Sequence, residues 1–203
     1  MVKNSYKGRF IIFEGLDGSG QSTQAALLED FLIKKGLKVL LTKEPTLSSP
    51  AGRRIRKILD KKEKISPKNL QLLFAKDRKE HLKKTVIPAL KRGTHVISDR
   101  YFFSSFAYGA SGGLDLQWLF KINDNFLLPD IAFILKVRPA VCIKRIEKRG
   151  SEKTLFEKKK SLEKVWKIYE ILPRYFKNAY IIKGEDEIER VFGQVKKIFK
   201  KLR

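Results

Sequence analysis

The sequence is poor in cysteine and in long apolar segments, and each shortage excludes a class of protein. The single cysteine, Cys142, excludes an intramolecular disulfide and any zinc site that needs several thiolates. No apolar run approaches the ~20 residues that a transmembrane helix needs. The opening stretch MVKNSYKGRF also lacks a signal-peptide core. We therefore expect a cytoplasmic protein that does not bind a membrane.

Acidic residues are scarce relative to basic ones. Lysine and arginine number 45 against 22 acidic residues, which gives a formal net charge of +23. Such an excess attracts polyanions, which include nucleic acids, anionic membranes and phosphate-bearing metabolites. The basic residues are spread over most helical segments, as in KKGLK and EKKKSLEK, and aromatic residues do not interleave with them as a stacking platform for nucleic acid requires. We therefore expect no specific nucleic-acid partner.

The apolar pattern predicts one domain over residues 1–203 with an α/β fold. Hydrophobic residues make up 42% of the chain, which is ample for a single core. Short, almost uninterrupted apolar segments predict strands at 9–13, 37–42, 94–99, 130–137 and 179–183. Helices are predicted at 22–35, about 51–59, 66–81 and about 186–201, and a further helix follows 81 and ends at 92. This alternation is typical of a five-stranded parallel sheet flanked by helices on both faces.

The stretch FEGLDGSGQST, residues 13–23, lies between the first predicted strand and a helix. Its glycines let backbone N–H groups approach an anion, and the helix start adds the positive end of its dipole. The usual phosphate-loop pattern is G-x-x-x-x-G-K-[ST], and Gln21 here replaces the lysine. The context predicts a P-loop NTPase-type fold. The loop residues predicted to bind the phosphates of a nucleotide, which the family resemblance described below implies is ATP, are Gly15, Leu16, Asp17, Gly18, Ser19, Gly20, Gln21, Ser22 and Thr23.

Two side chains near the loop suit a metal ion. Ser22 can offer its hydroxyl to a Mg²⁺ ion that bridges nucleotide phosphates, and Asp99 ends the third predicted strand as the second ligand. Arg100 follows Asp99, is always charged, and is suited to stabilise oxygens during phosphoryl transfer. The alternative role of Arg100 is an ion pair with Asp99.

Motifs over nearly the whole chain resemble those of the thymidylate kinase family. In chain order they are FEGLDGSGQSTQ, KEPT, GRRIRKIL, LLFAKDRKEH, VIPALKRG, DRYFFSSFAYG and LPDIAFIL. The resemblance implies phosphorylation of dTMP to dTDP with ATP and Mg²⁺, by an enzyme that forms a homodimer.

The resemblance also implies roles for residues that spacing alone does not single out. Phe74 is expected to stack on thymine, although its spacing equally fits a core residue. Arg78 would contact the base or the monophosphate, Ser105 the base, and Tyr108 would crowd the 2′ position of the sugar. Arg56 would hold the substrate phosphate; without the resemblance it reads as a solvated helix charge. The expected dTMP-binding set is Asp17, Lys43, Pro45, Arg56, Phe74, Arg78, Arg100, Ser105 and Tyr108.

The family carries a mobile lid, which the resemblance places at about residues 145–160. Arg145, Arg149 and Lys153 would reach ATP from this lid, and its closure would exclude water from the transfer. Asp17 would touch the sugar 3′-hydroxyl or orient the acceptor phosphate. The expected catalytic residues are Asp17, Gln21 and Arg100.

Four departures from the family pattern leave alternatives open. Gln21 has no charge, and loss of one preorganised donor commonly costs roughly 10²–10³ in rate. Lys43 stands in place of an arginine, Gly109 in place of a glutamine, and 154–155 in place of an Asp-Arg pair. The alternatives are a nucleotide-binding homologue with weak or no catalysis, or a kinase for another deoxynucleoside monophosphate. We favour an active enzyme in which another cation, from Lys43, Arg149 or Lys153, replaces the missing lysine.

Overall fold

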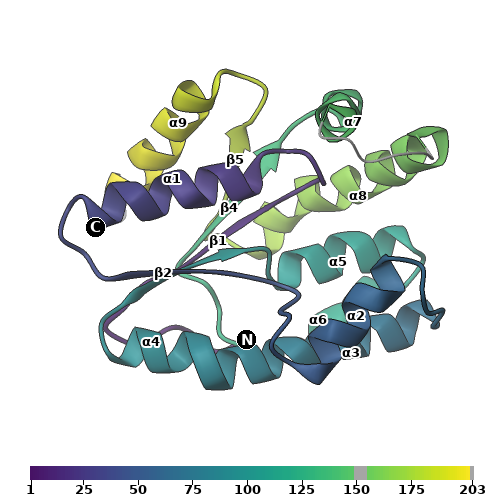
Figure 1. Ribbon diagram of the computed structural model, residues 1–203, viewed down its shortest axis with the longest axis horizontal. Coiled ribbons are helices and arrows are strands. Elements are labelled where there is room, and N and C mark those ends of the chain that lie inside the picture. The colour runs from purple at the N-terminus through teal and green to yellow at the C-terminus, as the bar shows by residue number, and fades with distance from the viewer. Residues whose placement is uncertain (149–154, 202–203) are drawn as a thin grey trace.

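A computed structural model of the protein describes residues 1–148 and 155–201. Its centre is a five-stranded parallel sheet with the strand order β2-β3-β1-β4-β5 (Figure 1). The strands are β1 (Phe10–Gly15), β2 (Val39–Lys43), β3 (His95–Asp99), β4 (Ile131–Lys136) and β5 (Ala179–Lys183). The predicted α/β fold is confirmed. No helix in the described ranges is long and apolar enough to cross a membrane.

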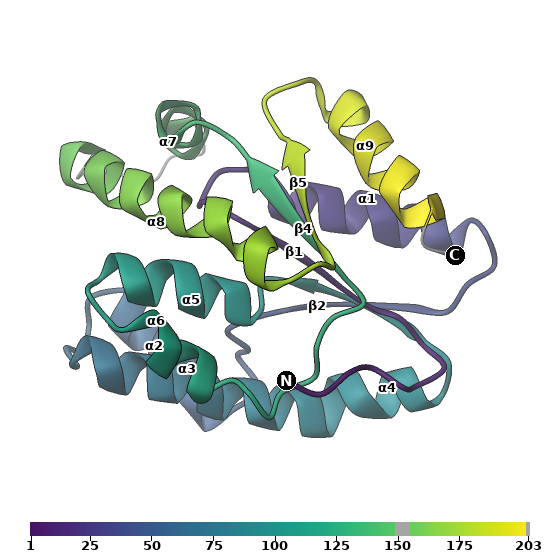
Figure 2. The same cartoon turned by 180° about the vertical axis from the view of Figure 1, so that it is seen from behind.

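Helices cover both faces of the sheet, as the two opposite views show (Figures 1 and 2). One face carries α1 (Gln21–Ile33) and α9 (Ile188–Lys201). The other carries α4 (Ile87–Lys91), α5 (Phe102–Ser111) and α8 (Leu155–Tyr175). The remaining helices are α2 (Pro50–Leu59), α3 (Pro67–His81), the π-helical turn η1 (Leu82–Val86), α6 (Leu116–Lys121) and α7 (Pro139–Glu147).

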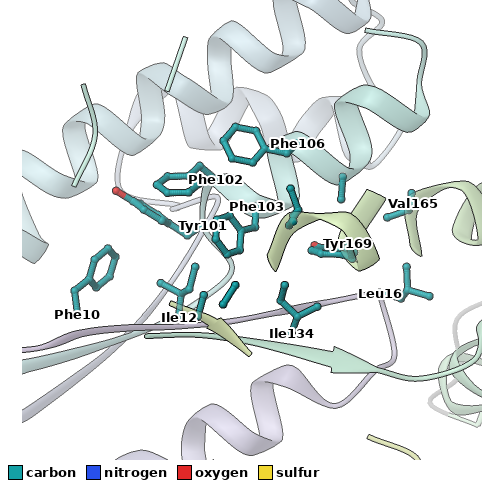
Figure 3. Packing of buried hydrophobic residues seen from close by; sticks show 14 of the residues in the cluster. Phe10, Ile12, Leu16, Tyr101, Phe102, Phe103, Phe106, Ile134, Val165 and Tyr169 are labelled. Atoms are coloured by element: carbon teal, nitrogen blue, oxygen red, sulfur yellow. The ribbon is translucent and has the colours of Figure 1, made fainter. Parts of the chain in front are cut away.

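The core lies in two layers because successive side chains of a strand point to opposite faces. Phe10 and Ile12 of β1 face the α5 and α8 side, where Tyr101, Phe102 and Phe106 pack in an aromatic group (Figure 3). The alternate β1 residues face α1 and α9. Every residue of β1 is buried, so this strand is fixed between both layers and delivers the following loop to a defined place.

Strand register brings three strand ends to one edge. Asp99 at the end of β3 lies opposite Phe13 of β1 on one side and Lys43 of β2 on the other. The loop after β1 leads into α1 at this same edge. In open α/β sheets, ligands bind outside the carboxyl ends of the strands. This edge is therefore where the predicted site residues should meet.

Element boundaries differ from the sequence prediction mostly at helix ends. Ser66 caps α3 by accepting from the Asn69 N–H at 3.3 Å, and Pro67 is its first helical residue, as predicted. The first helix stops at Ile33, since residues 34–36 form a turn that ends in the left-handed Gly36. The last helix begins at Ile188, two residues later than predicted.

Candidate active site

The loop between β1 and α1 depends on glycines. Gly15, Gly18 and Gly20 have φ values of +152°, +82° and +95°, which favour glycine. A Cβ at Gly18 would lie 2.5 Å from the backbone oxygen of Cys142, so the loop packs closely on α7. A cavity of about 180 Å³ opens beside the loop. It is lined by Asp17, Gly18, Gly20, Gln21, Ser22, Thr23, Lys43 and Arg100.

The two predicted metal ligands are in contact: Ser22 lines this cavity, and Asp99 lies behind it. Ser22 Oγ donates to Asp99 Oδ2 at 2.6 Å, and Lys43 Nζ lies 2.9 Å from the same oxygen. The other oxygen of Asp99, Oδ1, is buried and has no hydrogen-bond partner among the described residues. A buried carboxylate oxygen without a partner is costly, and Mg²⁺ prefers such hard oxygen ligands. The residues present therefore fit a magnesium ion.

Arg100 is held in place by the phosphate loop. Its Nη2 lies 2.7 Å from Asp17 Oδ1, and its Nη1 donates to the Gly15 carbonyl at 3.2 Å and to Ser104 Oγ at 2.9 Å. Arg100 has φ +77°, a left-handed conformation that is uncommon outside glycine and often found at functional sites. The alternative ion pair with Asp99 is not formed, because Lys43 takes that position.

Asp17 links Arg100 to a second predicted residue. Tyr108 donates its hydroxyl to Asp17 Oδ2 at 3.2 Å, and the Arg100 guanidinium lies 5.6 Å from the Tyr108 ring centre. Three of the expected dTMP-binding residues, Asp17, Arg100 and Tyr108, thus form one cluster at the rim of the cavity.

Glu14 lies beneath this cluster, and the sequence analysis did not single it out. Its Oε1 accepts from the Tyr101 N–H at 2.7 Å, and its Oε2 from Ser104 Oγ at 2.6 Å and Tyr169 OH at 3.0 Å. Burial raises the pKa of Glu14 to about 7, although the nearby Arg100 and the hydrogen-bond donors lower it. The signal in the sequence is a lone acid in the otherwise apolar strand FIIFEG.

Gln21 occupies the lysine position of the loop but brings no positive charge to the cavity. It is 6% exposed, and its Oε1 accepts from Ser19 Oγ at 3.1 Å. The side-chain carbonyl is therefore tied back into the loop, and the amide group is the donor that position 21 can offer.

On the acceptor side, Arg78 is fixed by three partners. Its side chain is 1% exposed. Its Nε donates to Glu44 Oε2 at 2.8 Å, Nη1 to Asn123 Oδ1 at 2.6 Å, and Nη2 to Ser105 Oγ at 3.3 Å. The predicted residues Arg78 and Ser105 are thus in contact. Glu44 and Asn123 were not predicted, because no local pattern pairs positions so distant in the chain.

The structure places three other expected residues on α3, after β2 and on α2. Phe74 lies one turn earlier on α3 and is half-buried. Pro45 follows Glu44 through a cis peptide bond. Arg56 is exposed on α2, where it pairs with Asp60 at 3.0 Å, and it lines neither of the two cavities beside the phosphate loop.

Gly109 has a packing reason to lack a side chain. A Cβ there would lie 2.9 Å from the Leu119 side chain and 3.4 Å from Gln71 Cδ. Gln71, on the facing helix α3, is buried, and its Oε1 has no hydrogen-bond partner in the described part of the chain. An amide side chain is therefore present beside Gly109, from α3.

A second cavity, of about 350 Å³, lies beyond Ser19 and Thr23 of the loop. Arg145, a predicted ATP-binding residue, lines it and donates from Nη1 to the carbonyls of Ser19 and Gly184, both at 3.2 Å. The sequence analysis missed the segment 184–188 that forms the opposite wall. Its signal was its place after the last strand, at the carboxyl edge of the sheet. Arg149 and Lys153 lie outside the described residues.

The comparisons with known proteins agree on one family. The sequence model of the family described as thymidylate kinase matches residues 13–195. The chain is 43% identical to the probable thymidylate kinase of Pyrococcus horikoshii, with 93% of this chain and 94% of the relative covered. It is 38% identical to the thymidylate kinase of Caldicellulosiruptor saccharolyticus (95% and 96% covered) and 34% identical to the probable thymidylate kinase of Archaeoglobus fulgidus (93% of each). The chain belongs to the thymidylate kinase family.

Proposed function

We propose that the protein transfers the γ-phosphoryl group of ATP to dTMP. The bond between the γ-phosphorus and the β–γ bridging oxygen breaks, a phosphate oxygen of dTMP bonds to that phosphorus, and ADP and dTDP result. The observation that carries the proposal is the position of the phosphate loop between two cavities, with Ser22, Asp99 and Arg100 at its edge.

On the donor side, the amides of residues 15–23 and the start of α1 hold the phosphates of ATP. The 350 Å³ cavity takes the adenosine, with Arg145 at its wall. A magnesium ion held by Ser22 and Asp99 supplies charge neutralisation at the phosphate oxygens when it is bound. Arg100 stabilises the charge that develops on the transferred group.

On the acceptor side, Phe74 stacks on the thymine, and Arg78 and Ser105 address its edge. Asp17 and Tyr108 border the sugar. Glu44 and Asn123 act through Arg78, since they fix its guanidinium in one orientation. Arg56 and Pro45 complete the acceptor site in this proposal, and Arg56 has to release Asp60 to do so.

Four further features extend the proposal to the whole protein. It acts in the cytoplasm, as one domain over 1–203, and as a homodimer like the family it belongs to. Residues 145–160 form a lid over ATP. The proposed lid residues Arg149 and Lys153 lie outside the described residues, and Arg145 lines the cavity beneath.

The test is a coupled assay of the purified protein with ATP, Mg²⁺ and each of dTMP, dUMP, dCMP and dGMP. We expect dTDP to form, with the other acceptors slower. Arg100→Gln, purified in the same way, is the control for a contaminating host kinase and should lose the activity. No product at high enzyme concentration, together with clean dTMP binding, would reject catalysis and leave the nucleotide-binding alternative. Faster turnover of another monophosphate would reject dTMP as the substrate.

A further inference from the structure

The phosphate loop lacks the cation that its motif normally carries. Gln21 is neutral, and its side-chain carbonyl is bound by Ser19 within the loop. In a water-poor site, a hydrogen bond from a charged donor is roughly twice as strong as one from a neutral donor. A triphosphate bound at this loop therefore needs a cation from another part of the chain.

Lys43 and Arg100 are the cationic side chains that line the 180 Å³ cavity, as the structure describes it. Arg100 is 13% exposed and already bound to Asp17, Gly15 and Ser104. Lys43 is 61% exposed, and its ammonium group contacts Asp99 and no other acceptor in the described ranges. Lys43 is therefore the cation at this cavity that can change partner at little cost.

Strand register places Lys43 beside the loop. Lys43 ends β2 opposite Asp99 at the end of β3, and β3 in turn pairs with β1, which leads into the loop. The ammonium group lies 2.9 Å from the Asp99 oxygen that Ser22 contacts at 2.6 Å. A phosphate oxygen bound at Ser22 would therefore be within reach of the Lys43 ammonium group after a small rotation of its flexible side chain.

We propose that Lys43 is a catalytic residue that supplies the cation missing at position 21. Phosphate oxygens of ATP compete with Asp99 Oδ2 for the Lys43 ammonium group, which then contacts the transferred phosphoryl group. This inference rests on the proposed function. It selects Lys43 from the three candidate cations that the sequence analysis named, and it moves Lys43 from the expected acceptor set to the transferred group.

Arg145 does not fill this role. Its guanidinium donates to the backbone carbonyls of Ser19 and Gly184, at the wall of the 350 Å³ cavity. It fixes the loop against the segment after β5 and does not line the cavity that holds Ser22 and Lys43.

The experiment is a double-mutant cycle of wild type, Lys43→Gln, Gln21→Lys and the double variant, with kcat and both KM values measured. Lys43→Gln should lower kcat by roughly 10²–10³. Gln21→Lys alone should change kcat by less than about threefold, and in the double variant it should restore most of the lost turnover. Lys38→Gln, an exposed lysine just before β2, is the matched control for loss of one charge and should stay within about twofold of wild type.

Several outcomes overturn the proposal. One is a Lys43→Gln variant with unchanged kcat, or with its loss confined to the KM for dTMP, which leaves Lys43 on the acceptor. Another is a loss of kcat in Lys43→Gln that Gln21→Lys does not reverse, which would mean that Lys43 acts by holding Asp99 in place. A third is an increase in kcat of about tenfold or more when Gln21→Lys is made in the wild-type protein. Such an increase would show that the wild type lacks a sufficient cation at the phosphates.

A binding measurement separates this proposal from the proposed function. Calorimetry with ATP in the presence of EDTA measures how much the cationic side chains contribute to ATP affinity, because magnesium is removed and turnover cannot occur. Lys43→Gln should weaken ATP binding on the order of tenfold, and the double variant should recover it. If wild type makes no dTDP, the proposed function fails, while this binding result still decides whether Lys43 contacts the phosphates of ATP. Unchanged ATP affinity in Lys43→Gln would overturn the proposal for Lys43.

Discussion

At the scale of single residues, Glu14 is a buried acid in the strand that leads into the phosphate loop. Its carboxyl group is fully buried under the Arg100 cluster and accepts hydrogen bonds from Tyr101, Ser104 and Tyr169. Burial outweighs these contacts and raises the pKa of Glu14 to about 7. The group therefore titrates near neutral pH, and it lies one residue before the end of the strand that delivers the loop.

The raised pKa of Glu14 predicts the sign of its effect on stability. Between pH 4.5 and about 7, the folded protein keeps a proton that the unfolded chain has released, so the free energy of unfolding falls as pH rises and levels off above that window. The Glu14→Gln variant has no group at this position that titrates in this pH window. Relative to it, the free energy of unfolding of wild type should fall by at most roughly 3 kcal/mol across the window. Denaturant unfolding of both proteins at several pH values measures this difference. Parallel pH profiles would contradict it.

Asp99 is the second residue whose replacement gives a defined result. Asp99→Asn removes the carboxylate that contacts Ser22 and Lys43, which is the charged one of the two proposed magnesium ligands. The Mg²⁺ concentration for half-maximal turnover should rise at least roughly tenfold, since even outer partners of metal ligands contribute 10–100-fold. A magnesium titration of the initial rate measures this, with ATP binding in EDTA as the control, which should not weaken because Lys43 loses its competing partner. An unaltered magnesium dependence would remove Asp99 from the metal site.

At the scale of elements, α3 carries the proposed acceptor residues Phe74 and Arg78 and is tied to the segment after β2. Asp77 accepts from the Thr46 N–H at 2.8 Å, from Thr46 Oγ1 at 2.6 Å and from Ser49 Oγ. The next residue, Arg78, binds Glu44. The end of β2 and the start of α2 therefore fix the face of α3 that carries Arg78.

Two serine caps test this arrangement as a matched pair. Ser66 caps α3 through the Asn69 N–H, and Ser49 caps α2 through the Gly52 N–H but also donates to Asp77. Ser66→Ala should lower the free energy of unfolding by about 1 kcal/mol, and Ser49→Ala by about 2–3 kcal/mol, because the latter also removes a donor from a buried carboxylate. Urea unfolding measures both. Only Ser49→Ala should also raise the KM for dTMP; equal losses in both variants would contradict the link to α3.

The elements also show what local sequence pattern can predict. The glycine loop, the Ser66-Pro67 helix start and the strands were predictable because each is set by neighbouring residues. The partners of Arg78 were not, since Glu44 and Asn123 are 34 and 45 positions away and meet it only through tertiary packing. The wall at 184–188 was missed for the same reason, because it becomes a wall only once β5 lies beside β4.

At the scale of the whole molecule, the parallel sheet brings donor and acceptor features to one edge. β1 delivers the phosphate loop, β2 delivers Lys43, and β3 delivers Asp99 and Arg100, while α3 and α5 hold the expected base contacts. The net charge of +23 suits two phosphorylated substrates that must approach each other against their own repulsion. The fold thus replaces the missing cation of the loop with one from β2, which is separated from β1 by β3.

Phosphoryl transfer within one turnover tests the central claim most directly. Enzyme in excess over ATP labelled in its γ-phosphate, mixed with dTMP and Mg²⁺ and quenched at intervals, reports where the label goes. We predict that the label passes from ATP to dTDP in step with ADP formation. Label that stays on ATP, or leaves as inorganic phosphate, would contradict a site built to deliver it to dTMP.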